Sequence, residues 1–168
     1  MSPGELLTDA FTRIREGGEA VVSGLSPEQL AHVPSPRANS IAWLVWHLTR
    51  IQDDHVAEVA GLDQVWTSAD WHDRFGLPFD PRATGYGHRP ADVAQLGGVE
   101  GELLVGYLDS VHTQTLGYVA DLTLDDLDRV VDTRWDPPVT LGVRLVSVLN
   151  DDAQHLGQAA YLRGLLER

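Results

Sequence analysis

Acidic residues and a histidine interrupt the apolar face of the last helix that the sequence predicts. Apolar residues recur there at helical spacing and define one buried stripe, made of Leu141, Leu145, Val148, Leu149, Leu156, Ala159, Leu162 and Leu166. Asp151, Asp152 and His155 lie on or beside this stripe. An unpaired carboxylate costs several kcal/mol in a core, so such residues persist there mainly when they are paired, hydrogen-bonded or bound to a metal. The fold must therefore bring a partner to this stretch from another part of the chain.

The spacing of Asp151 and His155 suits a shared cation. The two residues are one helical turn apart on the same face. A carboxylate oxygen and an imidazole nitrogen at this spacing can both approach one cation at about 2.0 to 2.2 Å, the distances that zinc prefers. A third ligand has to come from another helix, and His47, on the flank of an earlier apolar stripe, is the candidate. A packed, hydrogen-bonded core histidine is the alternative role for His47, but together the three residues predict a metal site.

The composition restricts the partners of the chain. Twelve basic residues against 25 acidic ones leave a net charge of −13, which repels phosphate backbones and anionic lipids and argues against nucleic-acid and membrane partners. There is no cysteine, so any metal is held by nitrogen and oxygen ligands. The amino terminus lacks a basic flank and a long apolar run, and no stretch approaches the ~20 apolar residues of a membrane span. We expect one cytoplasmic domain spanning residues 1–168.

Four long helices are predicted. The first ends near Ser23, the second is capped by Asn39-Ser40 and stops at Gly61, the third begins at Pro90, and the fourth follows Thr140 and runs close to the carboxyl terminus. Short connectors separate them, except for a long loop over residues 62 to about 90 that is rich in aromatic residues, glycine and proline. Residues 129–139 should form an extended arm that ends at a double proline. The sequence thus predicts an all-α, four-helix bundle with a long loop between helices 2 and 3.

Acidic and aromatic residues of the second helix have expected positions of their own. Asp53 and Asp54 are expected on a solvent-exposed acidic face. Trp43 and Trp46 either wall a pocket or pack against the long loop. A loop of this length is usually functional or a lid, so we expect it to shape the mouth of a pocket.

Two segments carry a family resemblance. Residues 39–50, which contain His47, and residues 150–159, which contain Asp151 and His155, resemble the DinB-like superfamily, in particular the branch of mycothiol-dependent maleylpyruvate isomerases and of metal-binding proteins of unknown function. Gly85-Tyr86-Gly87 and the Trp-Asp-Pro-Pro segment starting at Trp135 agree with that branch. The resemblance implies a four-helix bundle, often a homodimer, in which His47, Asp151 and His155 hold zinc or nickel. Many members have histidine at position 151, so the shorter aspartate leaves open whether Asp151 or Asp152 is the ligand.

The resemblance also implies an activity. Three protein ligands leave an open metal position, and a thiol that coordinates there loses its proton. We therefore expect a metal-dependent S-transferase that uses mycothiol or a similar low-molecular-weight thiol, with Trp43 and Trp46 beside the electrophile. Gln158 is either an outer-shell or substrate-binding residue or a residue that only forms a hydrogen bond between helices. A metal-dependent hydrolase and a non-catalytic bundle, stabilised by a metal or by a buried polar network, are the alternatives.

Overall fold

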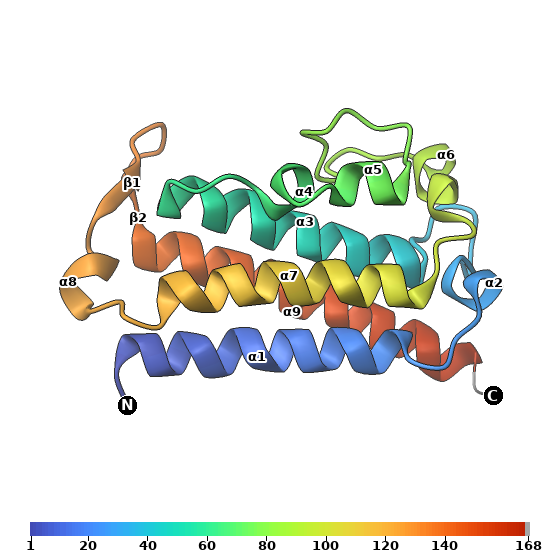
Figure 1. Cartoon of the computed structure of the whole chain (residues 1–168), viewed down its shortest axis with the longest axis horizontal. Coiled ribbons are helices and arrows are strands. Elements are labelled where there is room, and N and C mark those ends of the chain that lie inside the picture. Colours follow the sequence, from blue (N-terminus) through green and yellow to red (C-terminus); the bar gives the residue numbers. More distant parts are fainter. Residues whose placement is uncertain (167–168) are drawn as a thin grey trace.

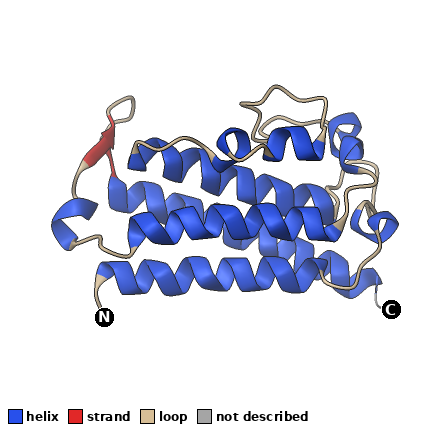
Figure 2. Cartoon of the chain, in the orientation of Figure 1, coloured by secondary structure: helices blue, strands red, loops and turns tan. Residues whose placement is uncertain are grey.

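Four long helices pack together as a bundle, as the sequence predicts (Figure 1). They are α1 (Pro3–Val22), α3 (Ile41–Ala60), α7 (Gly101–Val119) and α9 (Leu141–Leu166). The computed structural model describes residues 1–166, and helices dominate that part of the chain (Figure 2). No helix in this range is long and apolar enough to cross a membrane.

The long helices begin where short polar side chains cap them. Ser2 and Glu5 form a reciprocal capping box at the start of α1. Ser40 accepts the backbone N–H of Trp43 at the start of α3, and Gly61 ends that helix in the left-handed conformation that glycine adopts without strain. Both boundaries of α3 therefore agree with the prediction, and they fix the position of His47 along the helix.

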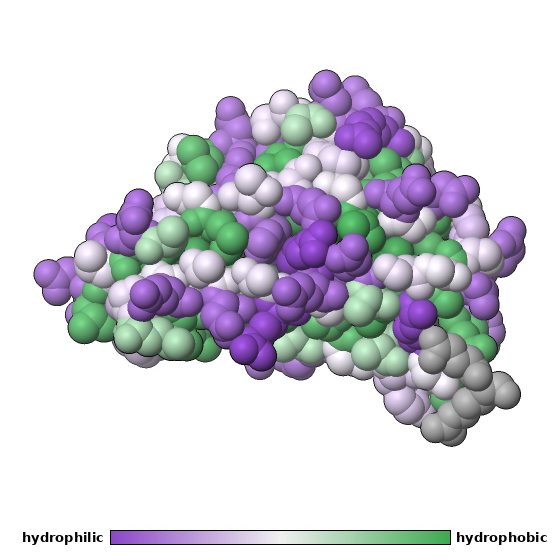
Figure 3. Space-filling model, turned by 60° about the horizontal axis from the view of Figure 1, so that its bottom comes forward, coloured by the Kyte–Doolittle hydropathy of each residue, from purple (hydrophilic) through white to green (hydrophobic). Residues whose placement is uncertain are grey.

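The packing of the bundle places α3 along α9. α1 packs against α7 and α9, and α7 also packs against α3. The helices bury apolar stripes between them and turn polar residues outward, as Asp9, Arg13 and Glu16 do on α1. Hydrophilic side chains gather at the middle of the molecular face shown in Figure 3, with apolar ones toward its two ends. The contact between α3 and α9 is the one that brings the predicted metal ligands together.

The third long helix starts later than predicted. Pro90 begins only a short helix, α6 (Pro90–Val93), which continues as a 3₁₀ turn, η1 (Ala94–Leu96). Gly97 then leaves helical geometry with a ψ of 125°, Gly98 takes a positive φ of 87° that glycine adopts without strain, and α7 begins at Gly101. The prediction that one helix runs from Pro90 was wrong because it did not allow for this turn.

The long loop contains two short helices, α4 (Val65–Ser68) and α5 (Trp71–Phe75), that the sequence pattern did not predict. Asp53 explains how the loop is held on α3. Its carboxylate accepts the backbone N–H groups of Val65 and Trp66, each at 2.8 Å, and the hydroxyl of Tyr107 at 2.8 Å. The expectation of a solvent-exposed Asp53 was therefore wrong, because this residue is buried and replaces a capping side chain at the start of α4. Asp54 is half-buried.

The opposite end of the bundle carries the predicted extended arm. α8 (Leu124–Leu127) lies at this end and follows α7, whereas α2 (Pro27–Leu30), between α1 and α3, lies at the other end (Figure 1). β1 (Val130–Asp132) then pairs antiparallel with β2 (Val139–Thr140), which leads directly into α9. Asp132 binds Arg144 of α9 at 3.2 Å, so the hairpin is tied to the helix that carries Asp151 and His155.

Candidate metal centre

The structure brings His47, Asp151 and His155 together between α3 and α9. One ligand atom from each residue lies within 4.8 Å of the others. The Nε2 atom of His47 is 4.0 Å from one carboxylate oxygen of Asp151, and the Nε2 atom of His155 is 3.7 Å from the other. Atoms bound to one tetrahedral zinc at about 2.1 Å lie roughly 3.4 Å apart, so small side-chain rotations close the cluster around a cation.

Each imidazole ring is oriented by a hydrogen bond at its Nδ1 atom. The Nδ1–H of His47 donates to the backbone carbonyl of Thr84, which can only accept. The Nδ1 of His155 is 3.1 Å from the amide oxygen of Gln158 and donates to it. In the neutral form of each ring the proton is thus on Nδ1, and Nε2, which lies toward Asp151, is free to bind a cation. Hydrogen bonds of this kind orient metal-binding histidines and select their tautomer.

The carboxylate of Asp151 provides a direct test of whether these residues suit a metal. Its Oδ2 atom is buried and has no hydrogen-bond partner within residues 1–166. A buried carboxylate oxygen without a donor is costly, and a cation between this oxygen and the two Nε2 atoms removes the cost. Burial also lowers the pKa of His47, which favours the neutral imidazole that binds metals. Two nitrogen ligands and one oxygen ligand therefore fit a divalent cation such as zinc or nickel.

Asp152, the other residue that the sequence left open as a ligand, lies elsewhere. It is fully buried and does not belong to the ligand cluster within the described residues. Both of its carboxylate oxygens lack a hydrogen-bond partner there, and burial raises the pKa of Asp152 well above its usual value. Between the two aspartates, geometry therefore favours Asp151 as the metal ligand.

The two tryptophans surround His47 differently. Trp43 stacks on the His47 ring, with centroids 4.5 Å apart, and its indole N–H donates to Nδ1 of His88. Trp46 instead packs against Trp66 and His88. Both indoles are buried, and neither lines the cavity beside Asp151. Both tryptophans pack around His47 and its neighbours, and a role for them in binding a substrate stays a prediction.

Gly85 provides the close contact that sequence reasoning missed. A Cβ atom at this position would lie 2.7 Å from Nδ1 of His47, 3.0 Å from Trp43 and 3.1 Å from Trp46. Its φ of 98° also lies in the range that other residues rarely adopt. The only sequence signal was its place in the Gly-Tyr-Gly segment; the Thr84 carbonyl that binds His47 carries no side-chain signal at all.

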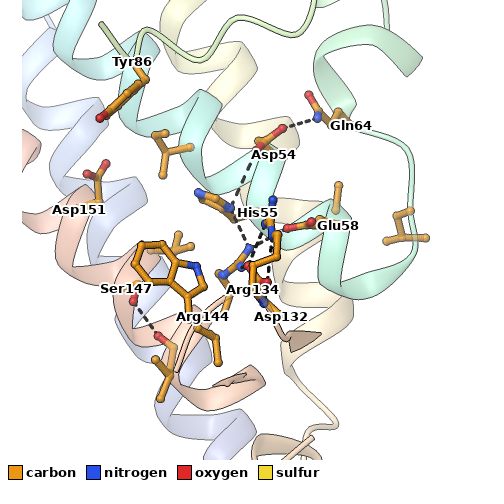
Figure 4. Close-up of a pocket in the computed structure, with 17 residues that line it drawn as sticks. Asp54, His55, Glu58, Gln64, Tyr86, Asp132, Arg134, Arg144, Ser147 and Asp151 are labelled. Carbon is orange, nitrogen blue, oxygen red and sulfur yellow. Dashed lines mark hydrogen bonds and ion pairs between the residues drawn. The ribbon is translucent and has the colours of Figure 1, made fainter. Parts of the chain in front are cut away.

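A cavity of about 850 Å³ adjoins the cluster at Asp151. It follows the groove between α3 and α9 toward the β1–β2 hairpin, and its lining includes His55, Tyr86, Arg134, Trp135 and Arg144. Asp151 and Tyr86 lie toward one end in Figure 4, and Asp132 and Arg134 lie toward the other. The candidate metal centre therefore faces a space that can hold a substrate.

Comparisons with known proteins place the whole arrangement in context. The family model for mycothiol-S-transferase matches residues 6–168. The crystal structure of a conserved protein from Enterococcus faecalis is 31% identical to this chain, with a TM-score of 0.89, and the match covers 97% of this chain and 96% of that one. No curated protein matches the chain.

Proposed function

Because the chain belongs to the mycothiol-S-transferase family, we propose that it transfers the sulfur of mycothiol, or of a similar low-molecular-weight thiol, to an electrophilic substrate. We further propose that His47, Asp151 and His155 hold zinc or nickel beside this reaction. The observation that carries the proposal is the cluster itself, in which two oriented imidazoles converge on the carboxylate of Asp151, and one oxygen of this carboxylate is buried without a hydrogen-bond partner among residues 1–166. Three protein ligands correspond to a catalytic site with an open position.

The three residues would hold the cation, in a fixed orientation of both imidazole rings, and would reduce its charge. Two neutral imidazoles and one carboxylate leave a divalent cation with a net charge of +1, which attracts an anionic sulfur more strongly than a water molecule. Such a cation, when bound, favours the deprotonated form of a coordinating thiol. The hydrogen bonds from His47 to Thr84 and from His155 to Gln158 keep both Nε2 atoms turned toward Asp151, where the three residues would hold the cation. The chain has no cysteine, so the reacting sulfur has to come from the thiol substrate.

An assay of thiol-dependent transfer tests this function. Purified protein is incubated with mycothiol and monochlorobimane, an electrophile that becomes fluorescent when sulfur replaces its chlorine. We expect a rate above the uncatalysed reaction that falls to background in His47→Ala and His155→Ala. His32→Ala is the matched control, because His32 is exposed and outside the cluster, and it should keep the wild-type rate.

The other outcomes of the assay separate the alternatives. Hydrolysis of p-nitrophenyl acetate without any thiol, lost in the same two variants, would favour a hydrolase. A folded, metal-loaded protein that catalyses neither reaction would favour a metal that only stabilises the bundle. Either result would contradict the transferase proposal.

The homodimer that the family resemblance implies is also part of the proposal. Two exposed residues of α9 outside the cavity beside Asp151, Val146 and Tyr161, offer a surface for a second copy. Light scattering during gel filtration should give a mass of twice 18.4 kDa. A mass of a single chain at micromolar concentration would contradict the dimer without affecting the transferase activity.

A further inference from the structure

The cavity beside Asp151 has a chemical character that the transferase function alone does not explain. Three carboxylates besides Asp151, those of Asp54, Glu58 and Asp132, and two guanidinium groups, those of Arg134 and Arg144, line it. Apolar small molecules bind mainly in pockets lined by hydrophobic and aromatic side chains with few polar groups. A cavity with this many hydrogen-bonding groups instead suits a polar ligand.

Both guanidinium groups in this cavity form ion pairs with carboxylates of the protein. Arg144 binds Glu58 at 2.7 Å and Asp132 at 3.2 Å, and Arg134 binds Asp132 at 2.8 Å. Asp132 is held so firmly in its charged form that its pKa lies well below its usual value, chiefly because of the hydrogen bonds from Arg134. Neither guanidinium is thus left without a carboxylate partner, and the lining carries a net negative charge. An anionic ligand is disfavoured in this cavity.

The remaining hydrogen-bonding capacity suits hydroxyl groups. Arg144 donates to Nδ1 of His55 at 3.1 Å, so the neutral His55 ring carries its proton on Nε2 and can donate it to a ligand. Burial and the nearby Arg144 lower the pKa of His55, which keeps the ring neutral. The carboxylates of Asp54 and Glu58 retain free lone pairs because each accepts from few partners. Hydroxyl groups, which both donate and accept, match such a mixture.

Two exposed aromatic side chains lie at the rim. Tyr86 is 94% exposed and Trp135 is 66% exposed, although both belong to residue types that usually bury most of their surface. Tyr86 comes from the long loop and Trp135 from the hairpin, so they approach the cavity from different segments. Aromatic faces with nothing packed on them are suited to cover the C–H face of a sugar ring.

The length of the cavity fits a ligand of this kind. Its lining extends along α9 from Asp151 back to Val143, a distance of about 12 Å at 1.5 Å per residue. This is comparable to the length of a disaccharide. A thiol whose sulfur reaches the metal centre can therefore place its remaining part along this groove.

We propose that this cavity is the binding site for the uncharged, hydroxyl-rich part of the thiol substrate, with Trp135 and Tyr86 stacking on its rings and with His55, Asp54 and Glu58 binding its hydroxyl groups. The inference rests on the proposed function and deepens it, because it assigns the residues that select one class of thiol. Thiols with a free carboxylate, such as glutathione, are discriminated against by the net negative lining.

Calorimetric binding to the protein as isolated tests the site independently of activity. We expect mycothiol to bind wild-type protein and to bind Trp135→Ala and Tyr86→Ala about tenfold more weakly, an ordinary loss for removing a stacking aromatic residue. Leu124→Ala is the matched control, because Leu124 is a large exposed apolar residue outside this cavity, and its dissociation constant should equal that of the wild type. Equal dissociation constants in all four proteins would overturn the inference.

Kinetics with a truncated thiol separate this inference from the proposed function. N-acetylcysteine amide is uncharged and has the reacting sulfur but no sugar. The two aromatic substitutions should raise KM for mycothiol about tenfold and leave kcat/KM for N-acetylcysteine amide unchanged. An equal loss with both thiols would overturn the cavity assignment while leaving the transferase intact. Weakened mycothiol binding in a protein that transfers neither thiol would support the cavity and contradict the transferase.

Discussion

Replacing Gly85 with alanine tests whether the long loop sets the position of His47. Gly85 packs against the imidazole so closely that an added Cβ atom would lie 2.7 Å from Nδ1, inside the distance that real Cβ atoms show. Gly87 provides a matched control. It has a similar positive φ, 77° against 98°, but a Cβ atom there would meet nothing within 4 Å. The two substitutions therefore share backbone strain and differ in the contact with His47.

The expected magnitudes follow from this difference. An alanine in a left-handed conformation costs roughly 1–2 kcal/mol, and both variants should lose about this much free energy of unfolding. Gly85→Ala adds a steric conflict with buried neighbours, for which about 1–3 kcal/mol is typical. The ring of His47 has to move, and its hydrogen bond with Thr84 is disturbed, so zinc affinity should fall about tenfold or more in this variant alone.

Urea denaturation and zinc titration check these values. Gly85→Ala should unfold at lower urea concentration than Gly87→Ala and should bind zinc more weakly, whereas Gly87→Ala should bind zinc like the wild type. The reasoning would be refuted if the two variants lost equal stability and retained equal zinc affinity, because the contact with His47 would then have no consequence.

Three further substitutions have expected outcomes. Gln158→Ala removes the acceptor of His155 Nδ1–H and should weaken zinc binding about tenfold, measured by competition with a chromogenic chelator, while wild-type affinity would contradict the role of Gln158. Asp53→Asn replaces the acceptor of two backbone N–H groups and should lower the free energy of unfolding by about 2 kcal/mol in urea denaturation, whereas a loss below the error would show that α4 needs no such acceptor. Burial raises the pKa of Asp152, so the folded state keeps a proton that the unfolded chain releases above about pH 3.9, and stability should decline as the pH rises. The gain in free energy of unfolding from Asp152→Asn should therefore be larger at pH 7 than at pH 4. If the stability of this variant and that of the wild type depended on pH in the same way, Asp152 would not be neutral in the folded state.

Much of the bundle is visible in the sequence because its signals are local. Ser40 and Gly61 mark the ends of α3 by their own chemistry, and the apolar stripe of α9 shows that Asp151 and His155 share a helical face. The pairing of His47 with them needed one step more, namely that two helices of a bundle lie side by side. This step succeeded because a buried acid and a buried histidine each require a partner.

The parts that sequence reasoning missed depend on contacts between distant or backbone atoms. The sequence pattern predicts a surface acid at Asp53 because its hydrogen-bond donors, the N–H groups of Val65 and Trp66, are twelve and thirteen residues away on a segment without helical periodicity. The start of α7 depends on the conformation of Gly98, one of several glycines in that stretch. The wall of the cavity likewise depends on the ion pair between Asp132 and Arg144, which only the folded hairpin brings together.

The metal content of the purified protein shows whether His47, Asp151 and His155 bind a cation. Elemental mass spectrometry on untagged wild-type protein, His47→Ala, His155→Ala and the control His32→Ala measures it without reference to any substrate. We expect about one equivalent of zinc or nickel per chain in the wild type and in His32→Ala, and a loss of the metal in His47→Ala and His155→Ala. A folded wild-type protein that contains no metal, and takes up neither zinc nor nickel when exposed to them, would contradict the account.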